Sequence, residues 1–144
     1  MNQNSGWIVF AYELEMFERM LELCGDQFCF SRPINNAIVE SLLLHIRNLC
    51  DLLLSRGVDA DDITLKTLLP HFNSPRVDEL KKLYGSRKEV DSPCWTINKR
   101  LAHSTLVRSE TFDYSPMLTQ LTPVLRSVIS EVQQARVQTE GNTS

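Results

Sequence analysis

One short segment of the sequence concentrates side chains that can handle phosphate. Asn98, Lys99, Arg100 and His103 fall within six positions, and Arg108 follows five residues after His103. Arginine binds phosphate through a planar fork of donors, and histidine exchanges a proton near neutral pH. This combination predicts that the protein handles a phosphate or another polyanion, without a metal. It leaves open whether any bond is cleaved.

A second polar row lies earlier in the chain, within an apolar stretch of helical period. It contains Glu40, His45, Arg47, Asn48 and Asp51. Arg47 is a further candidate for binding phosphate, and Asp51, one helical turn later, can hold its guanidinium in place. The alternative is that the polar rows are internal ties between helices, because buried polar groups must find partners.

Helical geometry separates the residues around His103 into a buried side and an open side. At about 100° per residue, Ile97 and Leu101 mark a buried stripe, whereas Lys99 and His103 share another side. His103 is the catalytic candidate, as an acid or a base. The phosphate-binding candidates are Arg47, Lys99, Arg100 and Arg108, and the supporting candidates are Asn48, Asp51 and Asn98.

The sequence lacks the motifs of several common enzyme classes. It has no glycine-rich phosphate loop, HExxH or GxSxG, so an NTPase, a zinc protease and a serine hydrolase are not indicated. Its four cysteines, at positions 24, 29, 50 and 94, form no CxxC pair, and we expect neither a zinc site nor a disulfide. We expect no cofactor, and an enzyme would have to work without a metal.

The composition is that of an ordinary globular protein. The 144 residues fit one domain, and 42% hydrophobic and 23% charged residues are typical of a folded chain. No apolar run approaches the roughly 18 residues that a membrane span needs, and the N-terminus lacks the basic start of a signal peptide. These features predict a cytoplasmic protein that does not contact membranes.

The net charge of −3 conceals an asymmetry along the chain. Residues 1–30 hold five acids and one base, whereas residues 81–108 hold seven bases and two acids. A basic second half can attract RNA or a nucleotide even though the whole chain is slightly acidic. The alternative is that these charges only form solvated helix faces.

Nearly every segment has helical period, which predicts an all-α fold. Four principal amphipathic helices and one or two short ones favour a four-helix-bundle-like architecture. We expect a single helical domain over residues 5–138 and a disordered tail over 139–144. The expected helices run from Trp7 to Cys24, from Pro33 to just before Gly57, from Asp61 or Asp62 to Pro70, from Ser74–Pro75 to Tyr84, from Pro93 through His103, and from Ser115–Pro116 onward.

Pro123 lies inside the apolar pattern of the last expected helix. Proline removes a backbone donor and clashes with the preceding turn. The sequence therefore predicts either a kink at Pro123 or a fresh helix start capped by Thr122.

The two polar segments resemble a known family. Residues 40–51 (ESLLLHIRNLCD) and 97–105 (INKRLAHST) are similar to the two signature helices of uncharacterised bacterial proteins of the HEPN-like helical-bundle class. The resemblance implies a four-helix bundle that forms homodimers, with roles in RNA cleavage, toxin systems and phage defence. It implies that the chain engages RNA or a nucleotide, with a protein partner where it belongs to a toxin pair.

Active members of that class use an arginine several residues before a histidine. Here only two residues separate Arg100 from His103, so the usual spacing is absent. The resemblance therefore carries His103 over as the catalytic residue, with Arg100, Lys99 or Arg47 in place of the arginine. It implies a metal-independent ribonuclease if the chain is an enzyme. The alternative is a non-catalytic interaction or regulatory module.

Overall fold

The structure, a computed structural model, describes residues 3–25, 32–57, 59–101 and 112–142 and is all-α over these residues, which confirms the predicted class. No described helix is both long enough and apolar enough to cross a membrane. The six helices are α1 (Gln3–Gly25), α2 (Arg32–Leu53), α3 (Leu65–Leu68), α4 (Pro75–Tyr84), α5 (Pro93–Leu101) and α6 (Ser115–Gly141).

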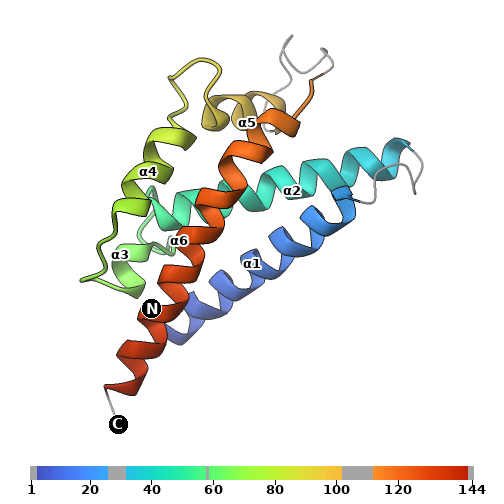
Figure 1. Cartoon of the computed structure of the whole chain (residues 1–144). Coiled ribbons are helices and arrows are strands. Elements are labelled where there is room, and N and C mark those ends of the chain that lie inside the picture. Colours follow the sequence, from blue (N-terminus) through green and yellow to red (C-terminus); the bar gives the residue numbers. More distant parts are fainter. Residues whose placement is uncertain (1–2, 26–31, 58, 102–111, 143–144) are drawn as a thin grey trace.

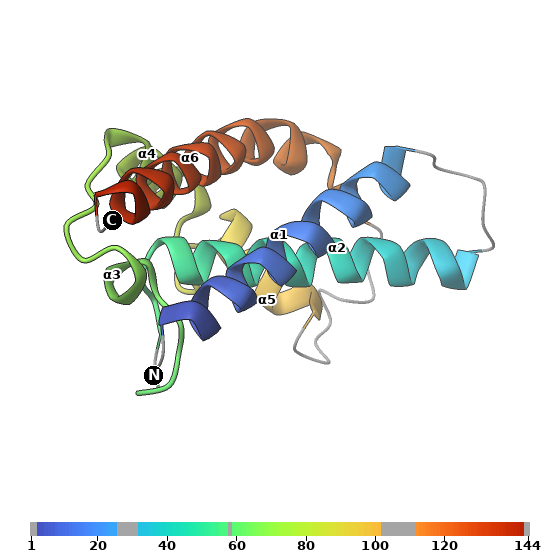
Figure 2. The ribbon, with the colours of Figure 1, turned by 90° about the horizontal axis from the view of Figure 1, so that it is seen from below.

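Helices α1 and α2 form an antiparallel pair on which the other helices assemble (Figure 1). The long helix α6 crosses this pair obliquely and packs along α4, and the view from below shows α4 and α6 together on one side of it (Figure 2). Helix α5 packs on α2, and the short helix α3 packs on α1. Helix α2 is therefore the element around which the others are placed.

The core is built around α2, whose apolar side chains are among the most deeply buried in the described structure. Its side chains Leu42, Ile46 and Leu49 have no exposed surface. Helix α6 contributes a stripe at intervals of three and four residues, which is the period of one helix face. The core side chains from the helices around α2 include Phe17, Leu80, Tyr84, Ile97, Leu121, Leu125, Val128 and Val132.

The predicted bounds of α4 are confirmed, and local chemistry explains them. Ser74 caps the helix, because its Oγ accepts the backbone N–H of Arg76 (3.1 Å), and Pro75 occupies the first turn. Gly85 ends it with φ 75° and ψ −152°, a conformation that only glycine adopts without strain. The predicted start of α5 at Pro93 is confirmed too.

Helix α3 is shorter than predicted, and the start expected at Asp61 or Asp62 is wrong. The Asp62 carboxylate accepts the backbone N–H of Asp59 (2.8 Å) in the preceding turn instead. Thr64 caps the helix in its place. It donates its backbone N–H to Thr67 Oγ1 (3.3 Å), and the Thr67 hydroxyl donates to the Thr64 carbonyl (2.7 Å).

Helix α6 is longer and more continuous than predicted. It passes through Pro123 without a fresh start, which was one of the two predicted alternatives. Leu121 and Leu125 on either side of the exposed proline are buried and hold both halves of the helix to the core. The tail expected over 139–144 is wrong for 139–141, which are helical. An ion pair one turn apart, from Arg136 Nε to Glu140 Oε1 (2.9 Å), supports this last turn.

The conformation of Gly85 predicts the effect of adding a methyl group there. A Cβ at this position would lie 2.5 Å from Ser92 Cβ, on a backbone with positive φ. We expect Gly85→Ala to lower the free energy of unfolding by about 1–3 kcal/mol. Gly25→Ala is the matched control, because nothing lies within 4 Å of its added Cβ, and it should change stability by less than about 1 kcal/mol. Urea denaturation measures both, and equal effects would contradict the strain.

Candidate functional site

The polar row of α2 is partly bonded to a carboxylate of α1. His45 Nδ1 lies 2.5 Å from Glu13 Oε2, and Asn48 Nδ2 donates to Glu13 Oε1 at 3.1 Å. Glu13 is 9% exposed and His45 is 5% exposed. The ring of Tyr12 packs edge-on against the His45 ring, with centroids 5.8 Å apart. Both oxygens of a buried carboxylate are thus satisfied, and His45 and Asn48 tie α2 to α1.

Glu13 was not among the residues singled out from the sequence. It lies three residues after Phe10 and four before Phe17, and both of these side chains are buried. An acid at this spacing lies on the buried side of an amphipathic helix and must find partners there. That spacing is the signal that could have identified it.

Arg47 and Asp51, at the C-terminal half of α2, are both half-buried. Arg47 and Asp51 form no hydrogen bond with each other in the described structure. Burial raises the pKa of the Asp51 carboxyl, and the charges of Arg87, Arg47 and Arg56 oppose that rise. Three guanidinium groups therefore lie near enough to act on one carboxylate, and one of them, Arg87, comes from the connection between α4 and α5.

Arg56 holds the end of α2 against the ends of α4 and α5. Its Nη1 donates to the carbonyl of Gly85 at 2.7 Å and lies 3.9 Å from Cys94 Sγ. Its guanidinium carbon lies 5.4 Å from the centre of the Tyr84 ring. No local pattern in the sequence marks this role of Arg56, because its partners lie about 30 and 40 residues further along the chain.

The predicted residues of α5 point in different directions. Asn98 is buried, and its Nδ2 donates to the carbonyl of Cys94 in the same helix at 2.9 Å. Lys99 and Arg100 are half-buried, and the Arg100 guanidinium lies 4.3 Å from the centre of the Phe112 ring. His103 and Arg108 lie outside the described residues, so their positions relative to Arg100 are not described.

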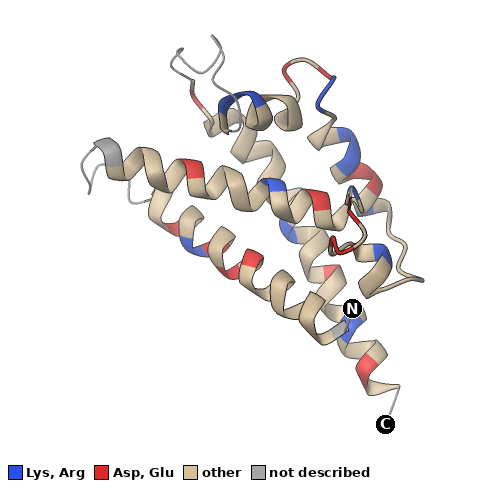
Figure 3. Ribbon diagram, turned by 180° about the vertical axis from the view of Figure 1, so that it is seen from behind, with Lys and Arg blue, Asp and Glu red and all other residues tan. Residues whose placement is uncertain are grey.

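Cations gather along α4, the α4–α5 connection and α5. We call Lys81, Lys82, Arg87, Lys88, Lys99 and Arg100 the basic edge. Residues 81–100 hold these six bases and two acids, a balance of +4. Lys81, Lys82, Arg87 and Lys88 are exposed, and none has an ion pair within the described part of the chain. Figure 3 shows the blue segments along these elements at one end of the molecule.

The described residues contain one group of acids close enough together to hold a metal ion. The carboxylates of Asp59, Asp61 and Asp62 lie within 4.8 Å of one another and are exposed. Exposed carboxylates gather in this way without any ion, and Asp62 already accepts the backbone N–H of Asp59. We assign no role to this group.

The bonds to Glu13 predict the effect of removing His45. His45→Ala leaves a buried carboxylate oxygen without its partner, which should lower the free energy of unfolding by about 1–3 kcal/mol and the melting temperature by several degrees. His71→Ala, at an exposed loop histidine, is the control and should stay within about 0.5 kcal/mol of the wild type. A double-mutant cycle between Glu13 and His45 should show coupling, and simple additivity would contradict the tie.

The raised pKa of Asp51 predicts a pH-dependent effect of Asp51→Asn. As the pH rises from about 3 to 7, the unfolded chain ionises Asp51 before the folded chain does, so the wild type loses stability that the variant keeps. The melting temperature of the variant relative to the wild type should therefore rise with pH. Asp113→Asn should show the opposite trend, because hydrogen bonds from Ser115 lower the pKa of Asp113. Parallel trends would contradict the assignment.

Comparison of the chain with protein-family models, with curated proteins and with solved structures gave no match. The functional conclusion therefore rests on the residues and on their arrangement.

Proposed function

We propose that the chain is a HEPN-like, cytoplasmic bacterial protein that engages RNA or a nucleotide along the basic edge. The observation that carries the proposal is the set of four exposed cations, Lys81, Lys82, Arg87 and Lys88, without an ion pair among the described residues. Cations that are not neutralised within the protein remain available to neutralise phosphates. The toxin or phage-defence setting and the homodimer come from the resemblance of residues 40–51 and 97–105.

An aromatic group beside the basic edge supports the proposal. Phe112 is 40% exposed, lies under the Arg100 guanidinium and packs edge-on against Tyr114, with ring centroids 4.8 Å apart. Proteins that bind single-stranded nucleic acid combine cations along the backbone with aromatic rings on which bases stack. Phe112 therefore brings a partly exposed aromatic ring next to a cation of the basic edge.

The site is placed on α4 and α5 rather than on the polar row of α2. His45 and Asn48 are already bonded to Glu13, and His45 is buried. Arg47, which is half-buried on α2, remains a candidate phosphate ligand. His103 remains the candidate acid or base, and Arg108 remains a candidate phosphate ligand, if the bound RNA is cleaved.

A second candidate is a non-catalytic helical interaction or regulatory module that binds a protein partner. The tie from Glu13 to His45 and Asn48 favours it, because these polar residues join two helices and His45 is buried. This candidate gives the basic edge no role in binding RNA.

Fluorescence anisotropy with a labelled single-stranded RNA tests the proposal. Lys81→Glu/Lys82→Glu should weaken binding by about tenfold or more and flatten its dependence on salt, because both phosphate contacts are reversed in charge. Arg19→Glu/Lys66→Glu is the matched control, because it reverses two exposed cations on α1 and α3. Its loss of affinity, measured as the change in log Kd, should be less than half of the loss in Lys81→Glu/Lys82→Glu.

The same samples, incubated with RNA in excess chelator, separate binding from catalysis. Cleavage that survives chelation and disappears in His103→Ala assigns a metal-independent ribonuclease. Binding without cleavage leaves the proposal as an RNA-binding module. If the wild type neither binds nor cleaves RNA, the proposal is wrong and the interaction module takes its place.

A further inference from the structure

A pocket among the described residues lies at the end of the molecule away from α5 and from the last turn of α4. It has a volume of about 820 Å³ and is formed by the start of α1, the α3–α4 connection and the C-terminal turns of α6. Figure 1 shows these three parts together beside both termini. The basic edge includes the last turn of α4, whereas this pocket lies at its first turn. Its volume is that of a site for a small organic molecule.

The floor of the pocket is apolar. Trp7 is 6% exposed and Leu69 is 8% exposed, and Leu68 and the half-buried Phe72 line the same space. These side chains are fixed by the core on their inner sides. They offer a preformed surface for an aliphatic or aromatic body.

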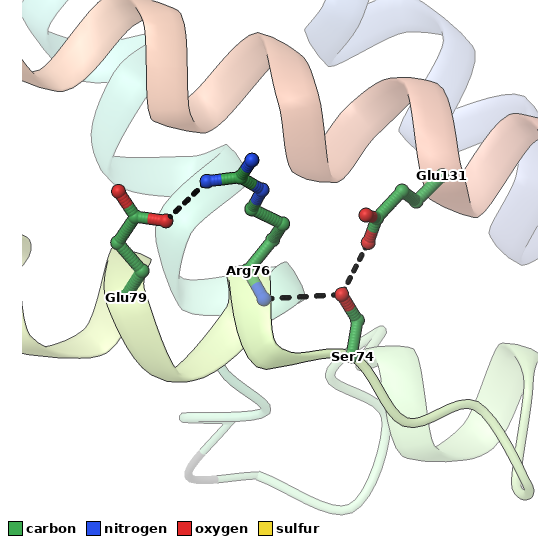
Figure 4. Close-up of polar contacts among 4 residues, drawn as sticks. All are labelled: Ser74, Arg76, Glu79 and Glu131. Atoms are coloured by element: carbon green, nitrogen blue, oxygen red, sulfur yellow. Dashed lines mark hydrogen bonds and ion pairs between the residues drawn. The ribbon is translucent and has the colours of Figure 1, made fainter.

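One carboxylate in the wall is held in place from one side only. Ser74 Oγ donates to Glu131 Oε2, and Ser74 is itself held by the backbone N–H of Arg76, as Figure 4 shows. The other oxygen, Oε1, accepts no hydrogen bond from the described residues. Glu131 is therefore an oriented acceptor on the pocket wall with one oxygen left for a ligand.

The other charged groups at the pocket do not form a hydrogen bond with Glu131. Arg136 donates to Glu140 at 2.9 Å and lies 4.6 Å from the centre of the Trp7 ring. The exposed His71 is the other titratable group in the lining. Arg76 acts on Glu131 only through its charge and donates to Glu79 instead. The C-terminal end of α6 adds partial negative charge, whereas the N-terminal end of α4 adds partial positive charge behind Ser74.

We propose that this pocket binds a small organic cation, namely a primary amine or an amidine on an aliphatic or aromatic body. The charged nitrogen donates to Glu131 Oε1, and the body lies on Leu69 and Phe72, next to the Trp7 ring that Arg136 covers. This site is independent of RNA binding at the basic edge. The lining holds two carboxylates, Glu131 and Glu140, against one guanidinium, so the pocket should favour a cation over an anion.

An NMR titration of the full chain with three ligands that share one ring tests the proposal. Benzylamine should shift the indole N–H signal of Trp7 and the amide signals at the start of α4 in a saturable way. Neutral benzamide and anionic benzoate should each bind at least about tenfold more weakly than benzylamine, because they lack the charge-assisted hydrogen bond. The indole signal of Trp95, in α5, is an internal reference and should not move.

Two variants assign the effect to named groups. Glu131→Gln should abolish the preference for benzylamine over benzamide, whereas Glu22→Gln, at an exposed acid of α1 outside the pocket lining, should preserve it. Arg136→Gln should strengthen benzylamine binding, because it removes a positive charge from the lining that repels a second cation. A dispersed spectrum of each variant confirms that it is folded.

Three results would overturn the proposal. Benzylamine could leave the Trp7 signal unmoved, benzoate could bind more tightly than benzylamine, or the preference could persist in Glu131→Gln. Should Glu131→Gln fail to fold, the ranking of the three ligands and the sign of the Arg136→Gln effect decide the question without it.

Discussion

The burial of α2 is the constraint on which the rest of the structure depends. Helices α1, α4 and α5 all pack on it, and its largest apolar side chains have essentially no exposed surface. A helix covered on so many sides has little room for polar groups, and each one must be bonded within the protein. Glu13 meets this demand for His45 and Asn48, and because the carboxylate itself is bonded at both oxygens, its own burial is offset. Removing one partner leaves the others uncompensated.

This constraint decides where chemistry can occur. The polar residues of α2 are of the types found in active sites, yet His45 is the most deeply buried of them. The helices at the periphery carry no such demand. Lys81, Lys82, Arg87 and Lys88 are exposed at the end of α4 and in the following loop, where solvent satisfies them until a polyanion does. A ligand can therefore reach α4 and α5, but it cannot reach His45 without opening the α1–α2 pair.

Local signals in the sequence predict the elements well and the ties between them poorly. Ser74, Pro75 and Gly85 fix both ends of α4 through a cap, a preset φ and a positive φ, and each effect acts within a few residues. The partner of His45 lies 32 residues away and the partner of Arg56 lies 29 residues away, so their identities depend on how helices cross. The predicted start of α3 was wrong for a related reason. Asp62 and Thr64 can both cap a helix, and the hydrogen bond from Asp59 to Asp62 decides between them.

Helix α4 connects the two proposed sites, and its dipole agrees with the charges at both ends. Glu131 lies at its first turn, whereas Lys81 and Lys82 lie in its last turn, roughly 10 Å further along the helix axis. Each such charge contributes only about 0.3–1 kcal/mol to the helix. Reversing the two lysines therefore changes the binding surface with little loss of fold. Changing Glu131 touches the cap of α4 itself, so glutamine, whose carbonyl still accepts from Ser74, is the replacement that separates charge from structure.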